Sequence, residues 1–365
     1  MDPSEITQAE ALRAHAPQAE AAQTPWPALP GEAASGTGAV SPPRGERHQA
    51  VREPALSASE WLRLNREGPL VSLGLPTRNA PQRLERILNQ ARQQTYQQLE
   101  ILVSDNGSSS EESWRLAQAQ AERDPRIQVF RHQQNIGYAG NHQFLVDRAQ
   151  GRYFVWWHDD DLFPEDYISR CVAMLEEDPQ LVLCSGACDR HLEGRFDRAY
   201  EDIDQRGLDA YQRLRMLLPD GFSYHWRYEY LQYGVFRRKA MRHRFSVDFK
   251  AEYCHLFGLA GQGALLSLPQ LRFIKNTTYS QLMNHASGGY RQRRWLLQPF
   301  AAISPTSLQQ CTPTFLRMLV MIGATPQLGL AQRWRLLWNA WYCFWHVPIR
   351  EETLRWRSLL GRRRR

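Results

Sequence analysis

The sequence has few cysteines and no cysteine pattern that points to a metal or a disulfide. It contains 6 cysteines in 365 residues, and only Cys184 and Cys188 stand close together. No Cys-x-x-Cys or Cys/His ligand spacing occurs, which excludes a cysteine-based zinc site and a disulfide framework. This usage is typical of a reducing compartment. We therefore expect a cytoplasmic protein, or one bound peripherally to the cytoplasmic face of a membrane.

Long apolar segments are also missing. No uncharged apolar run reaches the roughly 18 residues of a membrane-spanning helix. Residues 1–25 carry acidic side chains and lack the apolar core of a signal peptide. Residues 1–57 are rich in Ala, Pro, Gly, Gln and Glu without a sustained apolar period, so we predict that this segment is disordered.

From Leu70 onward, apolar strand patterns alternate with helical patterns. The strands are expected near residues 70–76, 99–103, 127–130 and 153–157. Between the first two, Leu84, Ile87, Leu88 and Ala91 recur at the spacing of one helix face. This alternation predicts an α/β fold with a parallel sheet, in which ligands bind beyond the carboxyl ends of the strands.

Polar clusters follow three of these strands, at residues 76–79, 105–107 and 158–161. The last is the run His158-Asp159-Asp160-Asp161, whose adjacent carboxylates repel one another unless a cation gathers them. Mg²⁺ and Mn²⁺ prefer oxygen ligands of this kind. An alternative is that Asp161 caps a helix, with Pro164 in its first turn. Convergence of the three clusters at one sheet edge favours the metal site.

The order of these motifs resembles the family 2 glycosyltransferases of the GT-A fold, over about residues 70–290. The resemblance rests on residues 71–79, on Gln94-Thr95-Tyr96 before 99–108, on Asn135-Ile136-Gly137 with Asn141, and on the aspartate run. It implies a Rossmann-like, mostly parallel sheet flanked by helices, with the domain at residues 66–290. It also implies inverting transfer of a sugar from a nucleotide diphosphate sugar to a hydroxyl acceptor, with Mg²⁺ or Mn²⁺.

The resemblance assigns the nucleotide-sugar cleft to the strand ends. Asp105 would accept a hydrogen bond from the nucleobase, although it could instead form an Asx turn before Gly107. Asn79 and Asn141 could instead be helix caps. The candidates for nucleotide-sugar binding are Pro76, Thr77, Arg78, Asn79, Asp105, Asn106, Gly137, Asn141 and Asp159.

The metal motif of the family is usually Asp-x-Asp-Asp, and His158 stands where its first Asp is expected. Asp160 and Asp161 match the later positions, and Asp160 is our candidate for the direct ligand. A shifted alignment would pair Asp159 with Asp161. His285 resembles a late histidine that reaches the diphosphate or the metal in relatives, although a lone histidine is more often structural.

An inverting displacement needs a general base for the acceptor hydroxyl. The family places an acidic pair near the start of a late helix, and Glu252 is our candidate here, with Asp248 second. Tyr253 occupies the position where the base is commonest, and Glu252 could simply be an acid favoured by a helix dipole. A degenerate scaffold or membrane adaptor without turnover is therefore an alternative. A nucleotidyltransferase would need a Gly-rich phosphate loop, which residues 75–79 do not provide.

Residues 291–365 are expected to form a helical, Trp- and Arg-rich region. Five apolar side chains fall on one helix face, namely Trp334, Leu337, Trp338, Trp341 and Trp345. Such a face could lie in a bilayer interface, or the helix could pack on the main domain. The net charge of +7 and the final arginines suit an anionic membrane surface. We expect a glycan or lipid-linked acceptor and no nucleic acid partner.

Overall fold

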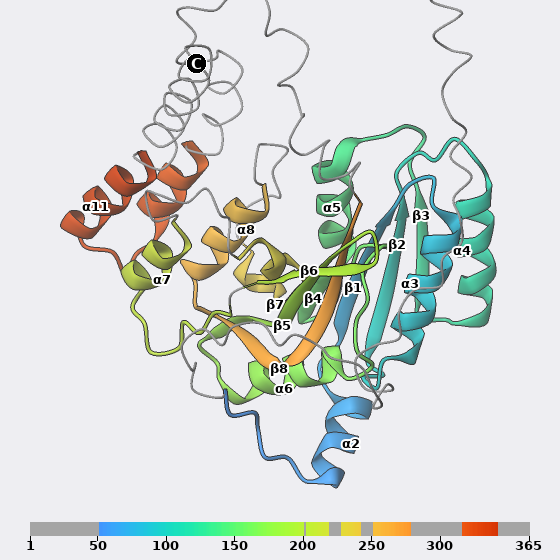
Figure 1. The fold of residues 1–365 in the computed structure, drawn as a ribbon, viewed down its shortest axis with the longest axis horizontal. Coiled ribbons are helices and arrows are strands. Elements are labelled where there is room, and N and C mark those ends of the chain that lie inside the picture. Colours follow the sequence, from blue (N-terminus) through green and yellow to red (C-terminus); the bar gives the residue numbers. More distant parts are fainter. Residues whose placement is uncertain (1–50, 201, 219–227, 242–250, 279–315, 342–365) are drawn as a thin grey trace, which may run out of the picture. The chain divides into compact units, whose positions relative to one another are not determined.

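The computed structural model describes residues 51–200, 202–218, 228–241, 251–278 and 316–341 (Figure 1). These ranges all lie in the larger of two compact units, Ser41–Arg365. Most of the segment predicted to be disordered, residues 1–50, lies outside them, as do Asp248 and His285. No helix within the described ranges is long and apolar enough to cross a membrane.

The described strands form a mixed, mostly parallel sheet in the order β3-β2-β1-β4-β7-β5-β6, with β8 also paired to β5. Four strands pair in parallel with one another, and they are β1 (Val71–Thr77), β2 (Leu99–Asp105), β3 (Ile127–Arg131) and β4 (Tyr153–Trp156). The others are β5 (Leu181–Leu192), β6 (Arg195–Ala199), β7 (Val235–Arg237) and β8 (Ala264–Thr277), of which β5 and β8 also pair in parallel. The predicted α/β class, with a mostly parallel sheet flanked by helices, is confirmed.

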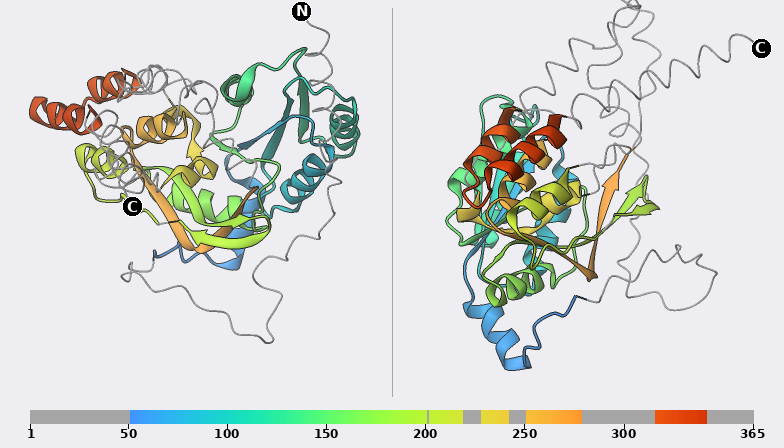
Figure 2. Two further views of the ribbon diagram at one scale, coloured as in Figure 1. Left: turned by 45° about the horizontal axis from the view of Figure 1, so that its top comes forward. Right: turned by 90° about the vertical axis from the view of Figure 1, so that its left-hand side faces the viewer.

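Helices flank the sheet on both sides (Figures 1 and 2). The bounds are α2 (Ala58–Glu67), α3 (Pro81–Gln93), α4 (Glu112–Arg123), α5 (Gly137–Arg148), α6 (Tyr167–Glu177), α7 (Ala210–Leu217), α8 (Ala251–Ala260) and α11 (Leu330–Trp341). The predicted face of α3 is confirmed, because its buried residues are Leu84, Ile87, Leu88 and Ala91.

The chain order explains where the sheet has its switch point. The chain runs from β1 to β2 and β3 in one direction, and then crosses to β4 on the other side of β1. Right-handed crossovers place α3 and α4 on one face of the sheet and α5 on the other. In such sheets ligands bind beyond the carboxyl ends of the strands at the switch point, which here are β1 and β4. There Thr77 Oγ1, at the end of β1, donates a hydrogen bond to Asp159 Oδ2 at 3.3 Å.

The structure describes residues 51–57, which belong to the segment predicted to be disordered, and they make specific contacts. Val51 is buried, and the carboxylate of Glu53 pairs with Arg170 on α6. Ser57 caps α2, since its side chain accepts a hydrogen bond from the backbone N–H of Glu60. Compositional bias hid these residues, because each contact depends on a partner elsewhere in the chain or on a short capping pattern.

The apolar sequence of residues 249–266 predicts one continuous helix, and this prediction is wrong at its C-terminal side. α8 stops at Ala260, and β8 begins at Ala264 beside β5. Gly263 lies so close to β5 that a Cβ there would sit 2.4 Å from Val182 Cγ1. The glycine thus permits the turn into the strand, which apolar periodicity alone does not reveal.

Candidate active site

Two buried aromatic rings anchor the ends of the aspartate run. Trp157 follows β4, and its backbone N–H donates to Gly74 O at 3.0 Å, which extends the pairing with β1. The Trp157 ring stacks on Phe163 with centroids 4.1 Å apart and planes at 3°. Both side chains are at most 2% exposed. The run His158–Asp161 therefore leaves the core and returns to it within a few residues.

Strand β8 holds the run from one side. Leu162 and Ile274 exchange two backbone hydrogen bonds, each of 2.9 Å. Asn276 donates from its backbone N–H to Asp161 Oδ1 at 3.1 Å, and from its side-chain Nδ2 to Asp160 O at 2.9 Å. Asn276 thus fixes both carboxylate-bearing residues. No local pattern pointed to Asn276, because it lies far along the chain from the run.

Helix α3 holds the run from another side. Arg86 donates to Asp159 O at 3.1 Å. One turn further on, Gln90 donates to Asp161 O at 3.3 Å and accepts a hydrogen bond from the Phe163 N–H at 2.8 Å. Side chains four residues apart lie on one helix face, so both reach the same loop. Polar residues bordering the apolar face of α3 were a signal that the sequence analysis missed.

The Gln94-Thr95-Tyr96 motif continues this contact just beyond α3. Gln94 donates to Pro164 O at 2.7 Å and accepts from the Ile168 N–H at 3.2 Å. The backbone N–H of Thr95 donates to Glu165 O at 2.8 Å. This part of the motif therefore holds the chain between the aspartate run and α6.

His158 is held by two neighbouring side chains. Its Nε2 lies 3.1 Å from His142 Nε2, and its Nδ1 lies 3.0 Å from the hydroxyl of Tyr233. Burial lowers the pKa of His158 to about 3, and it lowers the pKa of His142 to about 3 as well. Both imidazoles are therefore neutral near pH 7. A cation could bind His158 only if one of these hydrogen bonds were given up.

Asp161 is a buried carboxylate with an unmatched oxygen. It is 1% exposed, and its Oδ2 has no hydrogen-bond partner in the part of the chain that the structure describes. Burial, followed by the charge of Asp160, raises the pKa of Asp161. One ligand atom from each of His158, Asp160 and Asp161 lies within 4.8 Å of the others. This set of acceptors could hold a metal ion.

A partly buried lysine lies near the same cluster. Lys275 Nζ is 3.7 Å from Glu229 Oε1 and 5.6 Å from the ring centre of Tyr233. Burial alone would lower its pKa, but Glu229, Tyr200 and Asp161 outweigh this and raise the pKa of Lys275 above its ordinary value. Lys275 therefore stays charged and offsets part of the negative charge behind Asp161.

Asp159 is bound differently from its two neighbours. Its Oδ1 lies 3.2 Å from Arg83 Nε on α3, and its Oδ2 accepts the hydrogen bond from Thr77. Burial raises the pKa of Asp159 to about 6, and the charge of Arg83 opposes this shift. Asp159 thus connects the end of β4 to β1 and α3 at the switch point. The sequence analysis had left the role of this residue undecided.

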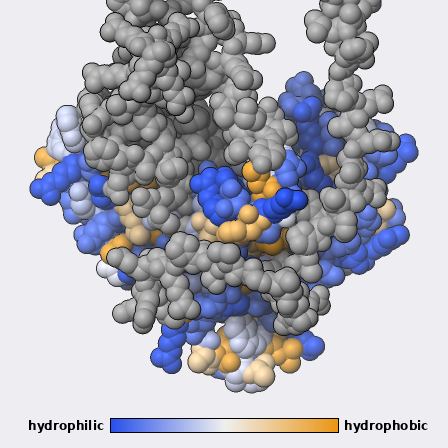
Figure 3. Space-filling model, viewed as in Figure 1, coloured by the Kyte–Doolittle hydropathy of each residue, from blue (hydrophilic) through white to orange (hydrophobic). Residues whose placement is uncertain are grey.

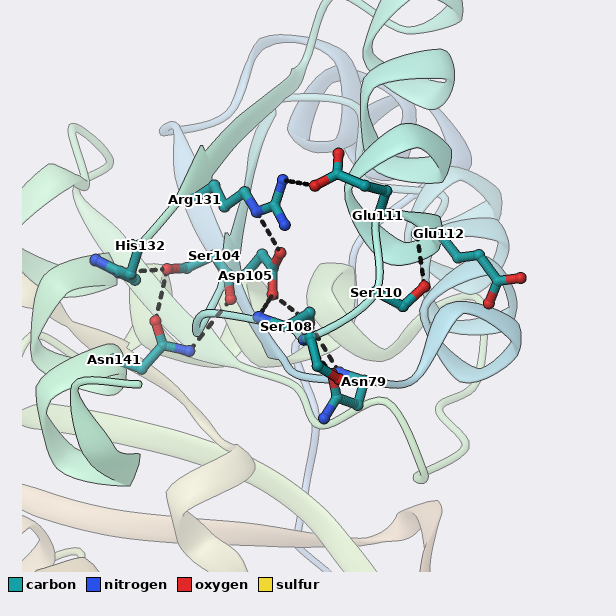
Figure 4. A network of polar contacts seen from close by, with 11 residues as sticks. Asn79, Ser104, Asp105, Ser108, Ser110, Glu111, Glu112, Arg131, His132 and Asn141 are labelled. Carbon is teal, nitrogen blue, oxygen red and sulfur yellow. Dashed lines mark hydrogen bonds and ion pairs between the residues drawn. The ribbon is translucent and has the colours of Figure 1, made fainter. Parts of the chain in front are cut away.

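Asp105 is the last residue of β2 (Figure 4). Its Oδ1 accepts hydrogen bonds from the backbone N–H of Ser108, at 3.0 Å, and from the Ser108 hydroxyl. Its Oδ2 lies 3.4 Å from Arg131 Nε and has no hydrogen bond within the described residues. One oxygen therefore shapes the turn, as the alternative interpretation held. Among the described residues, the second oxygen is paired only with the guanidinium of Arg131.

Asn79 is not a helix cap, and that alternative was wrong. Ala80 is the N-cap residue of α3 and makes no side-chain cap. Asn79 adopts φ 51°, its N–H donates to Ser108 Oγ at 2.8 Å, and its Oδ1 accepts from the Ser109 N–H at 2.8 Å (Figure 4). The residue therefore ties the loop after β1 to the loop after β2.

Asn141 does not cap its helix either, because α5 begins at Gly137. It is buried within α5, where it accepts from Ser104 Oγ at 2.6 Å and donates to Ser104 O at 3.2 Å. Asn106 accepts from the Ile136 N–H at 2.9 Å and donates to Gly137 O at 3.2 Å. These contacts dock α5 and its preceding loop onto the end of β2.

The structure brings the candidates of the first four strands to one sheet edge. Pro76 and Thr77 end β1 beside Ser104 and Asp105 of β2, and Arg78 follows at the surface. Glu252 lies in the first turn of α8, where the side chain is outside the described part. Its role, and those of Asp248 and His285, stay predictions.

Comparison with known proteins identifies the region that carries this site. Residues 72–245 match the family described as "Glycosyl transferase family 2". The putative glycosyltransferase EpsH of Bacillus subtilis is 28% identical over 194 residues, which cover 52% of this chain and 54% of EpsH. The uncharacterized protein y4gI of Sinorhizobium fredii is 27% identical over 151 residues, 41% of this chain and 16% of that protein. The chain spans about half of EpsH and less of y4gI.

Solved structures share the fold. S. aureus TarS 1–349 superimposes with a TM-score of 0.52 and 12% identity, covering 74% of this chain and 70% of that one. Its complex with UDP-GlcNAc gives a TM-score of 0.52 and 14% identity, covering 73% and 70%. At this identity the likeness concerns the fold alone, and it confirms the expected GT-A architecture.

Replacing Gln90 with Leu tests the contact between α3 and the aspartate run. We expect the free energy of unfolding to fall by about 1–3 kcal/mol, because the Phe163 N–H loses its partner within a partly buried loop. Urea denaturation followed by circular dichroism measures this change. Gln93→Leu makes the same change on the exposed side of α3 and should stay within about 0.5 kcal/mol of wild type. Equal losses in the two variants would contradict the assignment.

Proposed function

Because residues 72–245 match glycosyl transferase family 2, we propose that this chain moves a sugar from a nucleotide diphosphate sugar to a hydroxyl acceptor with inversion at the anomeric carbon. The glycosyltransferase class follows from the family. The inverting single displacement, the metal dependence and the residue roles are the proposal. The family match does not favour the alternative of a scaffold without turnover.

The observation that carries the proposal is the pair of buried, incompletely matched carboxylates at the carboxyl ends of β2 and β4, the two strands that flank β1. Asp105 Oδ2 and Asp161 Oδ2 are both buried without a hydrogen bond among the described residues. An unmatched buried acceptor costs about 1–3 kcal/mol, so each is suited to gain a partner from a ligand. A nucleotide diphosphate sugar with a divalent cation offers both partners, a nucleobase N–H at one end and the metal at the other.

The cation site fits Mg²⁺ or Mn²⁺. Asp160 and Asp161 supply carboxylate oxygens, which these hard cations prefer. We assign Asp160 as the direct ligand, with Asp161 second and His285 as a further candidate. When bound, the ion would neutralise charge on the diphosphate leaving group.

The remaining residues of the site would bind and orient the donor. Asp105 would accept a hydrogen bond from the nucleobase, while its other oxygen keeps the turn at Ser108 closed. Residues 76–79 would line the base and ribose. Asn106 and Gly137 would form the opposite wall, and the φ of 81° at Gly137 allows close approach of backbone to ligand.

The displacement itself needs one proton acceptor. The acceptor hydroxyl oxygen would bond to the anomeric carbon as the bond from that carbon to the diphosphate oxygen breaks. Glu252 would take the hydroxyl proton, with Asp248 as the second candidate. The acceptor we propose is a glycan or a lipid-linked sugar at the cytoplasmic face of a membrane, in synthesis of a cell-surface polysaccharide or glycolipid. The TarS complex with UDP-GlcNAc makes UDP sugars the first donors to test.

Asp160→Ala tests the metal-dependent donor site. Wild type should gain thermal stability from the matching sugar nucleotide together with Mn²⁺, because a ligand that binds only the native state stabilises it. We expect the variant to lose at least about tenfold in Mn²⁺-dependent donor affinity, as removal of a charged ligand contact costs roughly 1.5–3 kcal/mol. Isothermal titration calorimetry measures the affinity. The control Asp166→Ala removes a half-exposed carboxylate near the run and should bind as wild type. Unchanged binding in Asp160→Ala would sink the site assignment.

Glu252→Gln tests the base. Loss of a general base typically lowers turnover by about 10²–10⁴-fold, while donor binding should be unaffected. Steady-state transfer assays and donor calorimetry separate the two effects, and Asp248→Asn is the matched comparison. A larger loss of kcat in Asp248→Asn would move the role to Asp248. Donor binding without transfer or hydrolysis in wild type would favour the scaffold.

A further inference from the structure

The described C-terminal region forms a short helical hairpin. Residues 316–324 are helical, and α11 follows after a turn. The guanidinium of Arg333 on α11 donates to three backbone oxygens of that turn, those of Gly323, Thr325 (3.0 Å) and Leu328 (3.1 Å). These hydrogen bonds satisfy carbonyls at the end of the first helix, where a positive charge is also favoured by the helix dipole. The two helices are therefore fixed to each other.

One face of the hairpin is packed in the core. Met318 and Ile322 of the first helix are buried, as are Leu336 and Ala340 of α11, each pair at a spacing of four. α11 also contacts α7. The hairpin is thus docked on the main domain, as one of the two sequence interpretations held. The docking uses a different face from the one that carries the tryptophans.

The opposite side of each helix exposes large apolar groups. We call them the hairpin apolar set: Leu316 (52% exposed), Val320 (70%), Leu330 (75%), Trp334 (67%) and Trp338 (64%). They recur at intervals of four, so each helix presents its members as one stripe. Half of the large exposed apolar residues in the described part belong to this hairpin, which makes it a patch and not scattered exposure. At the left edge of Figure 3, in the region of α11, a few hydrophobic residues lie among hydrophilic ones.

Charge indicates what kind of partner fits this set. Residues 316–341 contain three arginines, Arg317, Arg333 and Arg335, and no acidic residue. A second copy of the same hairpin would bring like charges together. The headgroup region of an anionic bilayer accepts both tryptophan rings and arginines, and it does so for helices too short to span.

We propose that this hairpin docks on the surface of an anionic phospholipid bilayer, with the hairpin apolar set entering the headgroup boundary and Arg335 facing the lipid phosphates. The arrangement would bring the sheet-edge site to a lipid-linked acceptor, and that consequence rests on the proposed function. Docking itself does not depend on sugar transfer. The two ideas can therefore fail separately.

Flotation of the full chain with lipid vesicles tests the proposal. Wild type should float with vesicles of phosphatidylcholine and phosphatidylglycerol, and more weakly with phosphatidylcholine alone or at high salt. We expect Trp334→Ser with Trp338→Ser to lower the apparent affinity at least about tenfold, because two interfacial side chains are lost. The control Leu62→Ser with Phe196→Ser removes two apolar groups that are 51% and 55% exposed elsewhere, and should float as wild type.

A second variant guards against loss of folding. Arg335→Glu should weaken flotation with anionic vesicles while leaving the weak binding to neutral vesicles unchanged. The far-UV circular dichroism spectrum and unfolding temperature of every variant report that the main domain is intact, and they depend on neither lipid nor donor binding. Wild-type flotation by the tryptophan variant would overturn the proposal. The proposal would also be overturned if the wild type forms a dimer in sedimentation velocity, the tryptophan variant is a monomer, and the wild type does not bind vesicles.

Discussion

Hydrogen bonds from residues of α3 and β8 hold the aspartate run in place against the mutual repulsion of its carboxylates. Three adjacent acids would separate if the loop were free, since like charges a few ångströms apart disfavour ionisation of both. The loop is not free, because Gln90 and the Asn276 side chain bind its main-chain groups, and the Asn276 N–H donates to the Asp161 carboxylate. The carboxylates are thereby placed before any ligand arrives, and this preorganisation is what the proposed chemistry requires.

The histidine at the start of the run changes the charge of the site. A neutral His158 stands where the family usually has an acid, and it is held by Tyr233 and His142. With Lys275 behind Asp161, the cluster carries less negative charge than three acids alone would give. We therefore assign binding of the proposed cation to Asp160 and Asp161, because Asp159 already contacts Arg83 and Thr77.

Local patterns predicted much of the fold and the place of the site. The strand runs, the apolar face of α3 and the polar strand ends are each written within a short window, and parallel pairing brings those ends together. What could not be predicted depends on contacts between distant segments. Asn276 reaches Asp161 across more than a hundred residues of chain, and Asn141 proved to dock α5 onto β2. Gly263 comes just before β8, where hydropathy alone predicts that the helix continues, because its role lies in close packing on Val182.

The central claim is that the end of β4 holds a divalent cation beside a nucleotide diphosphate bound at the end of β2. Anomalous diffraction from crystals grown with Mn²⁺ and UDP tests it most directly. We expect a manganese peak within about 2.0–2.3 Å of a carboxylate oxygen of Asp160, the usual distance for a hard cation with oxygen ligands. We also expect the nucleobase to lie beside Asp105. A nucleotide bound at Asp105 with no manganese at the aspartate run, or manganese bound elsewhere, would contradict it.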